Sequence, residues 1–133
     1  MNLLVNVDVD DVGRAEEFYV RALGLRAGRR FGTAMLELLG AGAPIYLLSK
    51  AAGTLPFAEA PAGRDYARHW TPVHLDFVVE DLDAAVARAV DAGARVEGGI
   101  VTRKWGRMAN LCDPWGHGLC LLQFSGRGYD ELL

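Results

Sequence analysis

The sequence carries one strand-and-helix pattern twice, at an offset of about 70 residues, and this repeat restricts the possible folds more than any other feature. In each copy apolar residues alternate along a short stretch, which is the period of a strand with one buried face. An aspartate suited to cap a helix follows, Asp11 in one copy and Asp81 in the other, and each helix pattern ends at a glycine, Gly24 or Gly93. The alternating positions are Leu3, Val5, Val7 and Val9 in residues 2–9, and Val73, Leu75, Phe77 and Val79 in residues 73–79.

Each copy then continues into three β-rich stretches, so each reads βαβββ. The predicted strands are Leu25–Phe31, Thr33–Leu39 and Pro44–Ser49 in the first copy, and Arg95–Ile100, Arg103–Cys112 and Gly118–Phe124 in the second. The predicted helix core positions are Val12, Ala15, Phe18, Tyr19, Ala22 and Leu23, and Leu82, Ala85, Val86, Ala89 and Val90. We therefore predict one α+β domain over residues 1–133, with module one at 1–49, a linker at 50–70, module two at 71–124 and a C-terminal tail at 125–133.

Composition excludes several classes of partner. The net charge of -3, from 14 basic and 17 acidic residues without long runs of one sign, does not favour binding to nucleic acid or to an anionic membrane. The N-terminal residues lack the basic and apolar regions of a signal peptide, and no apolar run reaches the ~20 residues of a membrane helix. We therefore expect a cytoplasmic protein. In that compartment Cys112 and Cys120 are expected to be buried reduced thiols, with a disulfide between them as the alternative.

In this layout the chain resembles the vicinal oxygen chelate superfamily, which includes glyoxalase I, bleomycin-resistance proteins and extradiol dioxygenases. The stretches that carry the resemblance are Asp11–Tyr19, Leu23–Leu25, Val73–Val79, Trp105–Arg107 and Asp113–His117. The resemblance implies that two βαβββ modules form an open, cup-shaped mixed β-sheet with the helices outside. It also implies that the cup holds a metal or an organic ligand, and that two chains pair as a homodimer.

The metal-binding positions of that family are only partly filled here. The resemblance places Leu4, Leu47, His74 and Cys120 at the four cup-facing positions. Leucine cannot ligate, and a tightly held divalent ion needs three or four protein donors. We therefore expect no metal cofactor. The alternative is a divalent ion such as Ni, Zn, Fe or Mn on His74 and Cys120, with Asn6 or Gln123 brought in by a one-residue shift of register.

A small-molecule site is expected in the cup, because a few polar groups converge between apolar walls. The polar candidates are Asn6, Asp8, Ser49, His74, Asp76 and Arg107, and Leu4, Leu47, Trp70, Trp105 and Cys120 are expected to line the same space. His74 and Asp76 are the candidate catalytic pair, since a neighbouring carboxylate raises the proton affinity of a histidine. The alternative is a histidine that is merely hydrogen-bonded inside a half-polar barrel. His69 and His117 are expected to be solvated.

The sequence-based hypothesis is a protein that binds a small aromatic or cationic molecule without a metal and acts by sequestration. The competing hypothesis is an enzyme, either a metal-dependent lyase, isomerase or dioxygenase, or a metal-free acid/base enzyme that uses His74 and Asp76. A third is an interaction module whose cup is filled by side chains. The linker, which contains Phe57, Tyr66, His69 and Trp70, is expected to be either a lid or part of a subunit interface.

Overall fold

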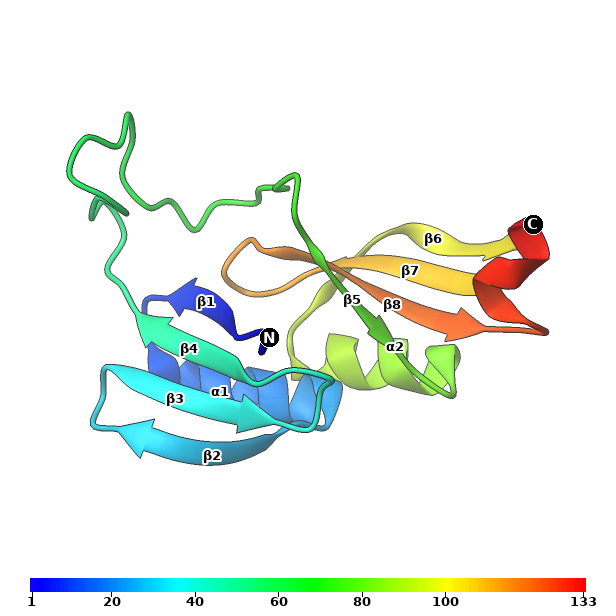
Figure 1. The fold of residues 1–133 in the computed structure, drawn as a ribbon. Helices are drawn as coiled ribbons and strands as arrows, with labels where there is room; N and C mark the ends of the chain where they lie inside the picture. The colour runs from blue at the N-terminus through cyan, green and yellow to red at the C-terminus, as the bar shows by residue number, and fades with distance from the viewer. The chain divides into compact units, whose positions relative to one another are not determined.

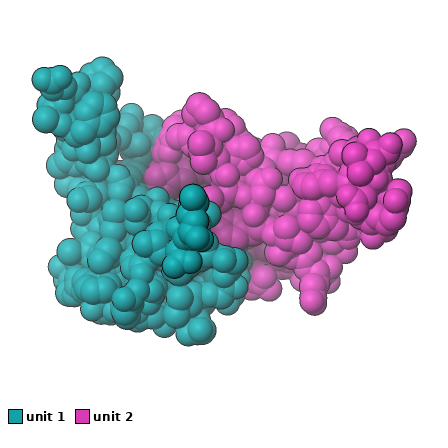
Figure 2. All heavy atoms as spheres, in the orientation of Figure 1, with its two compact units in different colours: residues 1–67 teal, residues 68–133 magenta.

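The computed structural model describes all residues, 1–133, and confirms the two βαβββ modules (Figure 1). The chain forms two compact units, residues 1–67 (unit 1) and residues 68–133 (unit 2), which Figure 2 colours separately. Each unit contains one open four-stranded sheet and one α-helix, so the α+β class is confirmed. The expected linker is divided between the units: it belongs to unit 1 as far as Ala67 and to unit 2 from Arg68.

In unit 1 the strand order is β1-β4-β3-β2, with β1 parallel to β4 and the other neighbours antiparallel. One face of this sheet packs on α1. The elements are β1 (Val5–Val9), α1 (Val12–Leu23), β2 (Arg26–Phe31), β3 (Met35–Leu39) and β4 (Ile45–Ser49).

Unit 2 repeats this arrangement with the strand order β5-β8-β7-β6, again with the first pair parallel. Helix α2 packs on one face of the sheet, and a short 3-10 helix ends the chain. The elements are β5 (Leu75–Val78), α2 (Leu82–Ala92), β6 (Arg95–Arg103), β7 (Gly106–Cys112), β8 (Gly118–Phe124) and η1 (Gly128–Leu132).

Both helices begin and end where the sequence predicts. The Asp11 carboxylate accepts a hydrogen bond from Arg14 N at 3.0 Å, and Asp81 caps α2 in the same way through Ala84 N. Gly24 and Gly93 end the helices with φ of 67° and 119°, a conformation that side-chain-bearing residues rarely adopt. The buried positions of α1 are largely those expected. In α2 the buried residues are Leu82, Ala85 and Ala89, whereas Val90, expected in the core, is 47% exposed.

The strand boundaries agree best where a turn motif marks them. Strand β8 has the predicted bounds, directly after the Asp113–His117 turn. The predicted break after Ile100 is wrong, because β6 continues to Arg103 and absorbs Gly98, with φ of 71°, in a register shift between Glu97 and Val101. The two cysteines are free and buried, which confirms the reduced thiols. Neither helix has the length and apolar character needed to cross a membrane.

Candidate functional site

The two faces of the unit 2 sheet have different chemistry. The face against α2 is largely apolar and includes Leu111 and Leu121, both fully buried. On the opposite face one row of register partners runs across three strands, from Asp76 to Cys120 to Asn110. Because register partners point to the same side of a sheet, these three polar side chains lie together, away from the helix.

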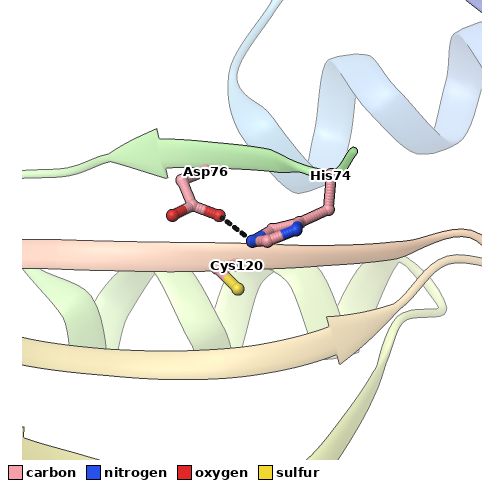
Figure 3. A group of neighbouring side chains, drawn as sticks. All are labelled: His74, Asp76 and Cys120. Carbon is pink, nitrogen blue, oxygen red and sulfur yellow. Dashed lines mark ion pairs between the residues drawn. The ribbon is translucent and has the colours of Figure 1, made fainter. Parts of the chain in front are cut away.

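His74, Asp76 and Cys120 form a compact cluster on this face (Figure 3). Their ligand-type atoms all lie within 4.8 Å of one another. His74 Nε2 is 3.3 Å from Asp76 Oδ1, and these two side chains are 36% and 38% exposed. Solvent therefore reaches the imidazole and the carboxylate, while Cys120 below them is buried. The structure thus brings together the two candidate catalytic residues and the cysteine named from the sequence.

The Cys120 thiol keeps its proton at neutral pH. Burial raises the pKa of the thiol to about 12, and the charge of Asp76 and a hydrogen bond with it act in the same direction. The thiol donates a hydrogen bond to Asn110 Oδ1 at 3.1 Å. Cys120 is therefore a neutral, buried hydrogen-bond donor beneath the cluster rather than a nucleophile.

Trp70 supplies an aromatic surface beside the cluster. Its ring centroid is 4.6 Å from that of His74, with the planes tilted by 37°, and the indole is 46% exposed. The Arg68 guanidinium lies 5.5 Å from the centre of the same ring. Glu97 on β6 binds that guanidinium at both Nε and Nη2, the second contact at 2.6 Å. Arg68 and Glu97 were not predicted, because residues 29 apart in sequence carry no local signal that they meet.

His69 and His117 were expected to be solvated, but the two imidazoles contact each other. His69 Nε2 lies 2.9 Å from His117 Nδ1, and both side chains are half-buried. The turn before β8 gives the reason: Asp113 Oδ1 accepts hydrogen bonds from the backbone N–H groups of Trp115 and His117 and so fixes the backbone of the turn that carries His117.

In unit 1, Asn6 and Asp8 lie on the sheet face turned away from α1, as expected from the alternation of β1. Asp8 is bound by Arg64, with Nε 2.6 Å from Oδ2. The Arg64 Nη1 atom also donates to the Leu55 carbonyl at 2.9 Å. The ion pair therefore ties the segment after β4 back onto the sheet, and Asp8 has an internal cationic partner other than the Arg107 considered from the sequence.

A polar network on the same face, in which Glu37 and Tyr46 are buried and Arg29 is exposed, was not predicted. Tyr46 is the register partner of both Asn6 and Glu37. Its hydroxyl donates to Glu37 Oε1 at 2.8 Å and accepts from Arg29 Nη2. Hydrogen bonds from Arg29 lower the pKa of Glu37 to about 2, and Tyr46 contributes in the same direction. One glutamate in an otherwise apolar strand, Met35–Leu39, was the available signal.

Two residues expected in the site lie elsewhere in unit 2. Arg107 is the register partner of Gln123, on the face covered by α2, and its guanidinium binds Asp83 at 2.8 and 3.0 Å. The expectation that it shares a face with His74 is wrong, because its parity along β7 is opposite to that of Asn110. Trp105 lies in the β6–β7 turn and packs edge-on against Phe124 and Tyr129.

Two residues of β4 also differ from expectation. Leu47 pairs with Val7 and Leu36 and is fully buried on the α1 face, so Tyr46 and Leu48 are the β4 residues that share a face with Asn6 and Asp8. Ser49 pairs with Val9 and borders a separate open pocket of about 480 Å³ at the start of α1. Pairing of β4 with β1, which the sequence does not encode locally, sets this register.

The cluster offers three donors of metal-ligand type, His74, Asp76 and Cys120, which is the lowest number that holds a divalent ion tightly. Burial raises the pKa of the Cys120 thiol, so an ion has to displace that proton before the third donor is available. In unit 1, Leu4 is apolar and the Tyr46 hydroxyl is already held by Glu37 and Arg29. We therefore derive no chemical step through a metal.

Comparison with known proteins gives a consistent result. A family model described as a glyoxalase-like domain matches residues 4–122. The chain is 34% identical over 124 residues to the anthracycline biosynthesis protein DauV of Streptomyces sp. (strain C5). That alignment covers 90% of this chain but 40% of DauV, so the chain spans about two fifths of the length of this curated relative.

Two solved structures illustrate the likeness in fold. TnmS3 from Streptomyces sp. CB03234, an antibiotic binding protein, is 28% identical with a TM-score of 0.66, and the match covers 94% of this chain and 96% of TnmS3. The fosfomycin resistance protein FosX from Listeria monocytogenes has a TM-score of 0.73 at 16% identity, with coverage of 100% and 98%. At that identity the second match concerns the fold alone.

Proposed function

Because the chain belongs to the glyoxalase-like domain family, within the vicinal oxygen chelate superfamily, we propose that it binds a small planar aromatic molecule without a metal and sequesters it. The observation that carries the proposal is the arrangement in unit 2, where the half-exposed Trp70 ring stacks on His74 beside Asp76. A ring system has an aromatic surface to stack on there, and a hydroxyl or amine on the ligand has the carboxylate and imidazole as partners.

The names of two relatives support this class of ligand. DauV is an anthracycline biosynthesis protein, and TnmS3 is an antibiotic binding protein. A molecule of the anthracycline kind combines a planar polycyclic ring with hydroxyl groups. For the present chain we therefore propose a hydroxylated polycyclic aromatic ligand, with ring stacking on Trp70 and hydrogen bonds to His74 and Asp76.

The test is a titration of the purified protein with 1,4-dihydroxyanthraquinone, followed by calorimetry. We expect saturable binding, and we expect Trp70→Ala to weaken it by about tenfold, since aromatic pairs contribute roughly 0.5–1.5 kcal/mol beyond area burial and 1.4 kcal/mol is tenfold in affinity. Trp105→Ala is the matched control, because Trp105 packs in the β6–β7 turn against Phe124 and Tyr129. Equal affinity of the two variants would contradict the proposed stacking.

Metal independence is tested separately by elemental analysis after the chelator-treated protein is exposed to Ni, Zn, Fe and Mn and excess ion is removed. We expect no stoichiometric ion, because displacing the proton of the buried Cys120 thiol weakens binding at the third donor. One ion per chain that is lost in His74→Ala would contradict metal-free binding and make a metal-dependent enzyme the leading hypothesis.

One observation favours a second candidate, a metal-free acid/base enzyme. The 3.3 Å separation of His74 Nε2 and Asp76 Oδ1 is the geometry of a base oriented by a carboxylate. In such an enzyme His74→Gln abolishes turnover of a bound substrate while its affinity changes little. In a sequestering protein the same substitution changes affinity alone, so the two functions are distinguished by one variant.

Pairing of two chains is also part of the proposal. Each sheet is open, with β1 and β2 at the edges of one and β5 and β6 at the edges of the other, and exposed edges favour association. Light scattering at the concentrations of the binding assay tests this point, and a monomeric mass would remove the homodimer from the proposal.

A further inference from the structure

The first three residues of unit 2, Arg68–Trp70, form a strap that lies beside the turn before β8. His69 N donates to the Gly116 carbonyl at 3.0 Å, and His69 and His117 form an isolated parallel bridge. The strap carries Trp70, so its position decides where the aromatic surface lies. It is held by side-chain contacts at both of its other residues, through Arg68 to Glu97 and through His69 to His117.

Trp70 is seated closely on the backbone of β8. A Cβ atom added at Gly118 would lie 2.1 Å from Cε3 of the Trp70 ring, so only glycine leaves room for the indole there. The ring is also stacked on His74 at 4.6 Å. The aromatic surface therefore exists only while the strap stays against the turn.

The contact between His69 Nε2 and His117 Nδ1, at 2.9 Å, requires one nitrogen to donate and the other to accept. This is satisfied when both imidazoles are neutral and also when one of them is protonated. When both are protonated, both nitrogens carry hydrogens, the bond is lost and two positive charges face each other. The contact therefore requires that at least one of the two imidazoles is neutral.

Charged groups of both signs lie around the pair. Asp113 is buried, and its Oδ1 accepts a hydrogen bond from the backbone N–H of His117. Arg68, whose Nη1 reaches the Gly116 carbonyl at 3.4 Å, brings a positive charge to the other side. Glu97 is engaged by that guanidinium, and Cys112 is a buried thiol. If both imidazoles carry a charge, each is therefore opposed by its neighbour and by the positive charge of Arg68.

We propose that the His69–His117 pair is a pH-sensitive clasp, which holds Trp70 on β8 at neutral pH and releases His69 and Trp70 in mild acid, while Arg68 stays paired with Glu97. Release exposes the Trp70 ring and removes its contacts with Gly118 and His74. As a consequence, which rests on the proposed function, affinity for an aromatic ligand falls as both histidines become charged. The clasp itself is a property of the ligand-free chain and is tested without any ligand.

The experiment uses the full chain labelled with 5-fluorotryptophan, whose three tryptophans give three ¹⁹F resonances. Trp70→Phe assigns the signal of interest, and Trp115, which is 3% exposed, serves as the internal reference. The solvent-isotope shift in D₂O reports exposure of each ring. Because Trp70 is 46% exposed in the closed strap, we expect its shift to rise about twofold between about pH 7.5 and pH 5, where imidazoles ordinarily become charged, while that of Trp115 stays constant.

Three variants make the test specific. In His117→Asn the amide oxygen takes the place of Nδ1 and does not titrate, so the strap should stay closed at both pH values. His74→Gln removes the remaining histidine of the chain; because His74 stacks on Trp70 the starting shift of Trp70 changes, but its dependence on pH should persist. Gly118→Ala, which displaces the indole, should give the exposed signal already at neutral pH. A constant Trp70 signal in the unsubstituted protein, or a transition that survives in His117→Asn, overturns the clasp whatever the ligand-binding titration shows.

Discussion

Cys120 is expected to be almost inert toward thiol reagents in the folded protein, and the structure gives the size of the effect. Burial first, and then the charge and hydrogen bond of Asp76, raise the pKa of the thiol from an ordinary 9.0 to about 12. The reactive species is the thiolate. At any pH below 9, the rise in pKa from 9.0 to about 12 lowers the fraction of thiolate about a thousandfold. The thiol is also only 2% exposed, which slows the reaction further.

The assay is the rate of alkylation by iodoacetamide at about pH 8, followed by mass spectrometry, in a Cys112→Ala background so that only Cys120 is counted. The same protein unfolded in urea gives the reference rate. We expect the folded protein to react at least about a thousandfold more slowly. Asp76→Asn should recover part of the difference but not all of it, because burial is the largest cause.

A folded-state rate within about tenfold of the unfolded rate would refute this reasoning, since it would require a thiolate population that the buried environment forbids. The outcome also bears on the metal question. A cysteine that ionises readily is a strong third ligand beside His74 and Asp76, whereas one that holds its proton tightly binds an ion more weakly.

Two further predictions concern stability. Hydrogen bonds from Arg29 and Tyr46 lower the pKa of Glu37 from an ordinary 4.5 to about 2, so its ionised form stabilises unit 1 above about pH 4.5 and this contribution is lost as the pH falls toward 2. The urea midpoint of the unsubstituted protein should therefore fall over that range more than the midpoint of Glu37→Gln, and parallel curves would show that the network adds no such pH dependence. Leu121→Ala, at a fully buried position, should lower the free energy of unfolding by about 2–5 kcal/mol in urea denaturation. Val90→Ala, at a position 47% exposed, is the matched control and should change it by no more than about 0.5 kcal/mol.

Local patterns in the sequence were sufficient for the helices and for the strand that a turn motif precedes. Asp11, Asp81, Gly24 and Gly93 define helix ends because capping depends on neighbours within a few residues. The closeness of His74 and Asp76 was also predictable, since residues two apart on a strand lie on one face.

What the sequence could not supply was the register between strands that are distant in the chain. The assignment of Leu47 to the polar face failed because it depends on how β4 pairs with β1. The prediction that Arg107 lies in the site with His74 was wrong for the same reason, because a shift of one residue along β7 exchanges the two faces of the sheet. Contacts such as Glu97 with Arg68 form only after these registers are set, so no local pattern reports them.

The repeat also explains why the proposed site is in unit 2. In each unit a residue of the first strand shares a row with one of the last strand and one of the strand beside it: Asn6 with Tyr46 and Glu37, and Asp76 with Cys120 and Asn110. In unit 1, Tyr46 and Glu37 of this row hydrogen-bond to each other and to Arg29, so these polar groups already have partners within the fold. In unit 2 the thiol is short and neutral, and His74 and Asp76 keep exposed faces. The same backbone position has thus become structural in one copy, while the other retains polar groups and an aromatic ring that a ligand is able to reach.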